Sequence, residues 1–173
     1  MRIHVAVVVL FAFAISAQPL TDQQRALLEK FPHLDPGRWQ FTSVSDDMAT
    51  LLDTHSGTRI GADGRNYHAW FVQLFDPHKP LKQPHRIGPR LVEFYDSLVY
   101  RMEFRCEDRL TRVLESTKYS GTIPVESFKL DPRDKEWDGV EPQTNNEETF
   151  EHACSYLDAK LSHTKSNKRK SNR

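Results

Sequence analysis

The clearest pattern in the chain is an alternation of apolar and polar positions between residues 98 and 106. The positions between the apolar ones include two arginines and a glutamate. A period of two is typical of a β-strand that has one face in the core and the other in water. The inward set is Leu98, Tyr100, Met102, Phe104 and Cys106. We therefore predict a strand whose last inward residue is a cysteine.

Shorter apolar runs predict further strands on both sides of this one. Residues 67–75 carry apolar side chains on both sides of the expected strand, which is typical of a central strand covered on both faces. Residues 54–65 contain three glycines and are expected to form a turn inside a hairpin. Pro124 indicates an edge position for the last strand. The other expected strands cover residues 39–44, 48–53, 110–119 and 123–130.

The period changes to that of an α-helix near the end of the chain. One stripe is apolar, and its members are Phe150, Ala153, Cys154, Leu157 and Leu161. Thr144-x-x-Glu147 and Asn145-x-x-Glu148 are both candidate capping boxes for this helix. A second capping box at Thr21 predicts a short helix that stops before Pro32. A helix packed on one face of an antiparallel sheet makes an α+β domain.

The first residues have the layout of a secretory signal. A short basic start precedes residues 5–15, which carry no charged or hydrogen-bonding side chain, and small residues follow. We expect cleavage after Ala17, with residues 14–16 as a competing site. A helix of this length spans about 17 Å against a hydrocarbon core of about 30 Å, so we expect no transmembrane segment in the mature chain. The protein should be exported, periplasmic or secreted, and not lipid-anchored, because the cleavage region has no cysteine.

Export determines how the two cysteines are interpreted. In an oxidising compartment, Cys106 and Cys154 have only each other as internal partners. A disulfide between them would stabilise the fold by about 4 kcal/mol in the chain-entropy model. The alternatives are an intermolecular bridge and a reactive free thiol.

Charge is unevenly distributed along a chain that is neutral overall, with 24 basic and 24 acidic residues. No acidic residue follows Asp158, and residues 160–173 are expected to be a basic disordered tail. The tail is either solvated or an electrostatic tether to an anionic polymer, a lipid headgroup or a nucleic acid. Residues 76–90 contain four prolines among cationic side chains and are expected to be an exposed, irregular loop. The candidate partner-binding residues of this loop are His78, Lys79, Lys82, His85, Arg86 and Arg90.

No motif with a known chemistry occurs in the chain. It has no H-E-x-x-H, no G-x-S-x-G, no P-loop and no C-x-x-C. Asp53, His55 and Ser56 are residue types found in hydrolases, but the polarity of a turn explains them. His78 and His85 could share a metal ion, but no carboxylate or cysteine completes a set of ligands with them. We predict no catalytic, cofactor-binding or metal-binding residue.

An ordered set of residues resembles the bacterial surface-adhesin protein E family. It consists of Trp39, Asp53-x-x-Ser56, Trp70, Cys106-x-x-Arg109-x-x-Arg112-x-Leu114, Tyr119-x-Gly121, Trp137-x-x-Val140-x-Pro142 and Ala153-Cys154. The resemblance extends over residues 38–157. It implies a bent antiparallel sheet of about six strands, with the terminal helix held on its concave face by a disulfide, and it allows a homodimer. It carries over the Cys106–Cys154 disulfide and the three tryptophans as framework, and residues 76–90 are expected to be an insertion.

These observations predict a domain organisation and a function. Residues 1–17 are the signal peptide, 18–37 an N-terminal helix and linker, 38–159 the adhesin-like domain and 160–173 the tail. We predict a non-enzymatic envelope protein that binds an anionic protein or polymer through the basic loop, the tail or the outer face of the sheet, and we expect no nucleic-acid partner. The alternative is a periplasmic enzyme, or an inhibitor of a cell-wall hydrolase.

Overall fold

The computed structural model describes residues 21–31, 34–35, 37–60, 66–131, 133–134 and 136–171, with side chains described as far as Lys160 except that of Gln23. The chain divides into two compact units, Met1–Pro32 and His33–Arg173. The predicted signal peptide and the glycine turn at residues 61–65 lie outside the described residues.

The first unit contains one short helix, α1 (Asp22–Lys30). Its capping box is as predicted, because two hydrogen bonds link Thr21 and Gln24 in both directions. The Gln24 amide donates to Thr21 Oγ1 over 3.2 Å, and the Thr21 amide donates to Gln24 Oε1 over 3.0 Å. These bonds satisfy two amides that the first turn of a helix leaves without partners.

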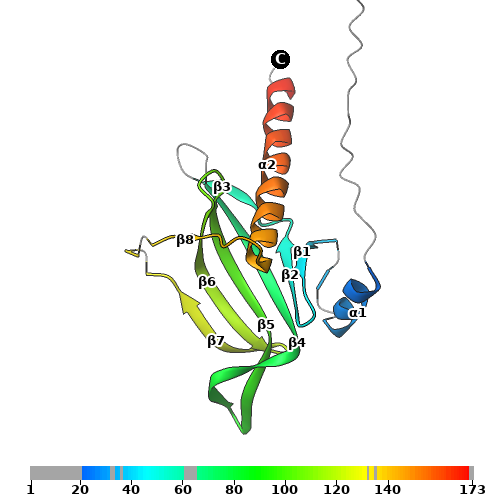
Figure 1. The fold of residues 1–173 in the computed structure, drawn as a ribbon, viewed down its shortest axis with the longest axis vertical. Coiled ribbons are helices and arrows are strands. Elements are labelled where there is room, and N and C mark those ends of the chain that lie inside the picture. The colour runs from blue at the N-terminus through cyan, green and yellow to red at the C-terminus, as the bar shows by residue number, and fades with distance from the viewer. Residues whose placement is uncertain are drawn as a thin grey trace, which may run out of the picture. The chain divides into compact units, whose positions relative to one another are not determined.

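The second unit contains an antiparallel sheet of eight strands (Figure 1). Six of them follow one another across the sheet in the order β1-β2-β4-β5-β6-β7, which confirms the expected six-stranded arrangement, while β3 pairs with β4 and β8 with β6. Pro124 lies in the edge strand β7, as predicted. The strands are β1 (Trp39–Val44), β2 (Met48–Asp53), β3 (Thr58–Ile60), β4 (Asn66–Ile87), β5 (Arg90–Arg105), β6 (Leu110–Ser120), β7 (Ile123–Lys129) and β8 (Asp138–Gly139).

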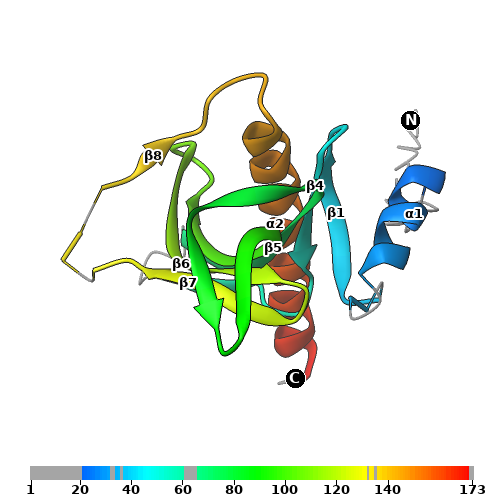
Figure 2. The ribbon, with the colours of Figure 1, turned by 90° about the horizontal axis from the view of Figure 1, so that it is seen from below.

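The helix α2 (Asn145–Ser171) packs on one face of this sheet, and the sheet curves around it (Figure 2). The Glu147 amide donates to Thr144 Oγ1 over 3.2 Å, so Thr144 of the first candidate capping box caps the helix. The Glu147 carboxylate accepts from the Gln143 amide over 2.7 Å, where a full capping box would use the Thr144 amide. The apolar stripe of α2 joins inward residues of β2, β4 and β5 in one core. Its buried members are Leu52, Tyr67, Ala69, Phe71, Tyr100, Phe104, Phe150, Ala153 and Leu157.

A disulfide joins the sheet to the helix. Cys106 Sγ and Cys154 Sγ are 2.06 Å apart, and neither residue is a free thiol. The alternation that placed Cys106 inward is confirmed: Tyr100 and Phe104 are buried, and the neighbouring inward residues pack against the same core. The predicted α+β architecture, with its helix held by a disulfide on one face, is therefore correct.

Residues 76–90 differ from the irregular loop that their prolines predicted. They continue β4 to Ile87 and turn through Gly88 into β5, forming a two-stranded hairpin. Lys79 pairs with Tyr95 and Arg86 with Leu91, with register shifts between the paired stretches. Proline is tolerated here because this part of β4 pairs with β5 alone, so one side of the strand needs no amide donor.

Two other expectations are corrected. The helix α2 continues to Ser171, so residues 160–171 are helical where a disordered tail was expected; this stretch contains no glycine or proline to stop a helix. Strand β4 is central, but α2 covers only one of its faces. On the other face His68 keeps 25% of its side chain exposed.

Candidate binding surfaces

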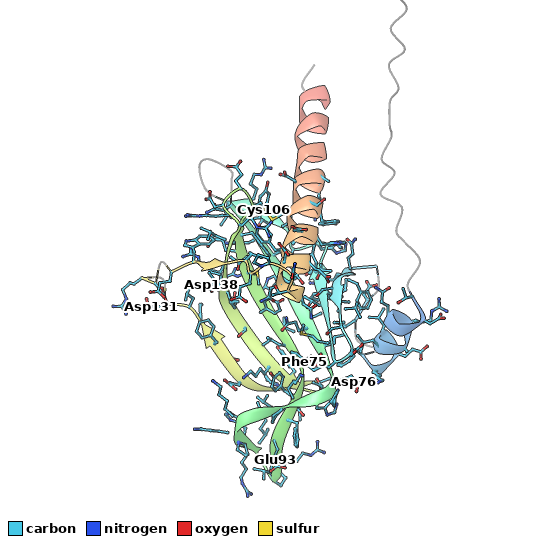
Figure 3. All side chains as sticks on the ribbon, viewed as in Figure 1. Phe75, Asp76, Glu93, Cys106, Asp131 and Asp138 are labelled. Atoms are coloured by element: carbon cyan, nitrogen blue, oxygen red, sulfur yellow. A yellow bond between two sulfur atoms is a disulfide. The ribbon has the colours of Figure 1, made fainter. Side chains whose placement is uncertain are left out.

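The hairpin of residues 76–96, here called the arm, is fixed to the rest of the sheet at its base. Lys79 Nζ lies 2.5 Å from Asp47 Oδ2, which joins the arm to the loop between β1 and β2. The rings of Phe75 and Tyr95 meet edge to face at 5.3 Å, and Leu81 is buried. Figure 3 shows the arm, with Glu93 on it, at the opposite end of the sheet from Cys106. Because Lys79 pairs with Asp47 at the base of the arm, its charge is balanced by a carboxylate.

The outer part of the arm is exposed and positively charged. Lys82, Arg86 and Arg90 form no salt bridge with the described residues, and no acidic residue occurs between Pro77 and Val92. The side chains of His78 and His85 are also exposed. Of the six candidate residues, the structure thus leaves five exposed on the arm and pairs only Lys79 with a carboxylate.

Positive charges in the middle of the arm also affect the pKa of a carboxylate on the edge strand β7. The pKa of Glu126 is lowered, first by its hydrogen bond from Lys118 and then by the positive charges of Lys118, His85 and Lys82. The arm carries apolar groups as well, since Leu91 is 56% and Phe94 50% exposed. The alternation of apolar and polar positions does not predict that Leu91 and Phe94 are exposed. Such a pattern does not show whether another layer of the protein covers the hairpin.

The face of the sheet opposite α2 carries a row of side chains across four strands. Strand register places Trp70 beside Arg101, Arg101 beside Glu115, and Glu115 beside Lys129. Arg101 forms a salt bridge of 2.8 Å with Glu115 and lies 5.7 Å from the centroid of the Trp70 ring. The outer face of the sheet was a predicted candidate surface, but none of these residues was predicted to bind a partner.

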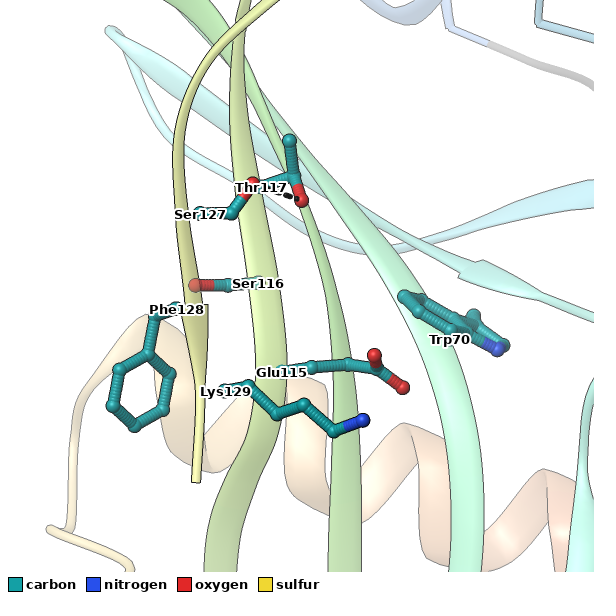
Figure 4. A pocket seen from close by; sticks show the side chains of 7 residues that line it. All are labelled: Trp70, Glu115, Ser116, Thr117, Ser127, Phe128 and Lys129. Atoms are coloured by element: carbon teal, nitrogen blue, oxygen red, sulfur yellow. Dashed lines mark hydrogen bonds between the residues drawn. The ribbon is translucent and has the colours of Figure 1, made fainter. Parts of the chain in front are cut away.

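A shallow pocket lies along this row, with a volume of about 340 Å³ (Figure 4). Trp70 forms one side, and residues of β6 and β7 form the other. Thr117 Oγ1 and Ser127 Oγ lie 3.1 Å apart at this second side and are hydrogen-bonded. The remaining lining residues are Glu115, Ser116, Phe128 and Lys129.

Next to the pocket, a buried carboxylate corrects the expectation that the charged face of β5 lies in water. Glu103 is only 4% exposed. Its Oε2 accepts a hydrogen bond from Arg112 Nε over 2.7 Å, and its Oε1 accepts one from Asn66 Nδ2 over 3.2 Å. Burial lowers the pKa of His68, although Glu103, 3.9 Å away, acts in the opposite direction. These partners compensate the cost of burying a charge.

Trp137 lies against two arginines on the same side of the sheet. The guanidinium carbons of Arg105 and Arg112 are 4.2 and 4.5 Å from the centroid of its ring. Nearby, β8 pairs with β6 through Thr111 and Asp138. The segment that contains Trp137 thus includes a short strand that joins the sheet.

The residues that resembled hydrolase components form a turn, as the sequence analysis predicted. Ser56 Oγ donates to the Asp53 carbonyl over 2.9 Å and accepts from the Trp70 amide at the same distance. The Asp53 carboxylate is buried, which by itself would raise its pKa. Two hydrogen bonds from Arg38 and one from the His55 amide act against burial and lower that pKa overall.

The described part of the chain contains no group of three or more histidine, cysteine or acidic side chains placed to hold a metal ion. None of its helices is long and apolar enough to cross a membrane.

Comparisons with known proteins give one family and two structures. The family model described as surface-adhesin protein E matches residues 39–155. The chain is also similar to two structures of Haemophilus influenzae protein E. Crystal form II has 12% sequence identity and a TM-score of 0.43, covering 67% of this chain and 93% of the other. The second has 13% identity and a TM-score of 0.42, covering 67% and 89%. No curated protein matches this chain.

Proposed function

Since the chain belongs to the surface-adhesin protein E family, we propose that it is an exported envelope protein that functions by binding, and that the arm is its contact surface. The observation that supports this surface is the charge of the outer arm. Lys82, Arg86 and Arg90 are exposed and form no salt bridge with the described residues, and the acidic residues of the chain lie outside the stretch from Pro77 to Val92.

The sign of this charge indicates an anionic partner. Acidic residues outnumber basic ones over residues 18–158, so the arm is a positive projection on a negative domain. A negatively charged protein or polymer would be attracted to the arm and repelled by the rest of the surface, which orients the encounter. Between exposed charges such an attraction weakens as salt is added. The helical basic segment at residues 160–171 would add to the same attraction.

We infer binding without catalysis. In the turn that contains Asp53, His55 and Ser56, the Asp53 carboxylate accepts from Arg38 and from the His55 amide, and the Ser56 hydroxyl donates to the Asp53 carbonyl. The carboxylate of Glu103 is likewise engaged by Arg112 and Asn66. The alternative of an enzyme, or of an inhibitor of a cell-wall hydrolase, stays a prediction from the sequence.

The test is retention on immobilised dextran sulfate, a sulfated glucose polymer, over a sodium chloride gradient. Replacing Lys82, Arg86 and Arg90 together by glutamine should weaken binding about tenfold, because each exposed charge contributes a modest attraction. The variant should therefore elute at lower salt. A chain that ends at Ala159 measures the separate contribution of the basic residues that follow.

The matched control replaces three cations elsewhere, Arg25, Lys30 and Arg133, by glutamine. It changes the net charge equally but leaves the arm intact, so its retention should stay close to that of the unmodified protein. If both triple variants elute at the same salt concentration, only net charge matters and the arm is not the contact surface. Retention that is insensitive to salt in the unmodified protein would also contradict the proposal.

A further inference from the structure

We propose that the pocket on the outer face of the sheet binds an acidic sugar, meaning a monosaccharide unit that carries a carboxylate, such as a hexuronic acid. This site is separate from the arm, and the proposal does not depend on the function proposed above. It is based on the complementary chemistry of three parts of the pocket, namely an aromatic wall, a charged row and a pair of hydroxyls.

The size of the pocket favours a ligand of one sugar unit. Its volume of about 340 Å³ is at the lower end of the range of about 300–1,000 Å³ found for small-molecule sites. The three strands that line it, β4, β6 and β7, belong to one hydrogen-bonded sheet. Trp70 faces the pocket from β4 (Figure 4), and its amide is held by Ser56. The lining is therefore held in position by backbone pairing.

The charged row determines which hydrogen-bonding and charged groups the ligand must carry. The Glu115 carboxylate can only accept hydrogen bonds, so a ligand beside it must supply donors. The Lys129 ammonium can only donate, and it forms no salt bridge with the described residues, so it favours an anion. With Arg101 included, the row carries one more positive than negative charge. A ligand that combines hydroxyl donors with one carboxylate satisfies both requirements.

The other two parts of the pocket fit the same ligand. Thr117 and Ser127 share one hydrogen bond, which leaves their remaining donor and acceptor positions available to the hydroxyls of a ligand. A pyranose ring also has a face of C–H groups, and the flat ring of Trp70 offers an apolar surface of matching size. A simple carboxylate such as acetate would use only Lys129, and a neutral sugar would use every part of the pocket but lack the ion pair with Lys129.

The three ligands therefore give a graded test. Sodium glucuronate, glucose and sodium acetate are titrated separately into ¹⁵N-labelled protein, and the indole N–H signal of Trp70 is followed by NMR. We expect glucuronate to shift this signal with a millimolar dissociation constant, glucose to bind more weakly and acetate to bind most weakly. Absence of a shift up to about 50 mM glucuronate, which corresponds to a negligible affinity, would overturn the proposal. So would equal responses to glucuronate and acetate.

Two substitutions locate the binding. Lys129→Gln should weaken glucuronate about threefold and affect glucose less, because only the acid forms an exposed ion pair with this residue. Lys118→Gln is the matched control. Lys118 is a cation of the adjacent strand β6, and its side chain points to the other face of the sheet, where it pairs with Glu126. Its replacement should leave the preference for glucuronate unchanged. An equal effect of both variants would show that only the general charge of the sheet is involved.

A third substitution tests the aromatic wall. Trp70→Ala should abolish the binding of both sugars. Because this variant lacks the indole signal, binding is measured by the NMR shifts of the Thr117 and Ser127 amides. Far-ultraviolet circular dichroism of the variant reports whether the fold is retained. If that variant does not fold, the Lys129→Gln comparison still decides the proposal. The arm variant should bind glucuronate normally, and Lys129→Gln should be retained normally on dextran sulfate. Each site can thus fail without affecting the other.

Discussion

The two faces of the sheet are formed by the same strands and differ in almost every physical respect. On the face covered by α2, side chains such as Phe104 and Leu157 are completely buried, and a disulfide holds the helix in place. On the open face, Arg101 and Glu115 keep about a third of their side chains exposed and bind each other. The covered face therefore supplies stability, and the open face is available for recognition.

The open face is nevertheless partly desolvated, as Glu103 shows. This carboxylate alternates along β5 with core residues, yet it is almost as buried as they are. The guanidinium of Arg112 pairs with it, and the ring of Trp137 lies against that guanidinium. A strand that is covered by a helix on one face only can thus be buried on both faces, when long side chains of neighbouring strands lie over its polar positions. This difference can be tested in three ways.

The largest effect is expected on the covered face. Replacing Cys106 and Cys154 together by serine should lower the free energy of unfolding by about 4 kcal/mol, because the unfolded chain loses its cross-link. Urea denaturation measures this loss. Chemical reduction of the unmodified protein should give a similar decrease, and a difference of less than 1 kcal/mol would mean that packing alone holds α2 in place.

A smaller effect is expected at the buried carboxylate of the open face. Glu103→Gln should cost about 2 kcal/mol, because Arg112 keeps its charge in a largely desolvated position and loses a charge-assisted partner. Glu115→Gln, on the same face but more exposed, is the control and should cost less than about 1 kcal/mol. Equal costs in urea denaturation would mean that Glu103 is not effectively buried.

The smallest effect is a dependence of stability on mildly acidic pH. Burial lowers the pKa of His68 on the sheet and of His152 on α2. The unfolded chain then binds protons more readily near the ordinary histidine pKa of about 6.5, so stability should fall as the pH drops from 7 through the lowered values. Thermal unfolding at pH 7, 6 and 5 measures this. Replacing both histidines by asparagine should flatten the profile, and an unchanged slope would assign the effect to other groups.

Much of the covered face could be predicted from the sequence, because burial there follows a simple period. The alternation ending at Cys106 and the helical stripe containing Cys154 each indicate one inward direction, and only two inward cysteines exist. The capping residues Thr21 and Thr144 mark the starts of both helices for equally local reasons. The expected pairing and sheet-and-helix packing were therefore correct.

The arm could not be predicted in this way. Four prolines in residues 76–90 oppose a strand in the interior of a sheet, and a loop was the reasonable expectation. The hairpin forms because β4 and β5 extend beyond their other neighbours, where each needs hydrogen bonds on one side only. The candidate residues of the arm were identified by charge alone, and the salt bridge that engages Lys79 joins residues far apart in the sequence.

By itself, the sequence determined which residues from Leu98 to Cys106 share the inward face and that both cysteines point inward, because these properties depend only on the periods of a strand and a helix. The tertiary structure alone decided which side chains meet across strands. A register shift in β5–β6 pairing places Glu115 opposite Arg101 and Val113 opposite Met102, so that Leu114 is passed over. If the pairing of Met102 with Val113 continued without that shift, Arg101 would lie opposite Leu114 and the row from Trp70 to Lys129 would be interrupted. Register of this kind depends on the hydrogen bonding of the whole sheet, which no local period of the sequence contains.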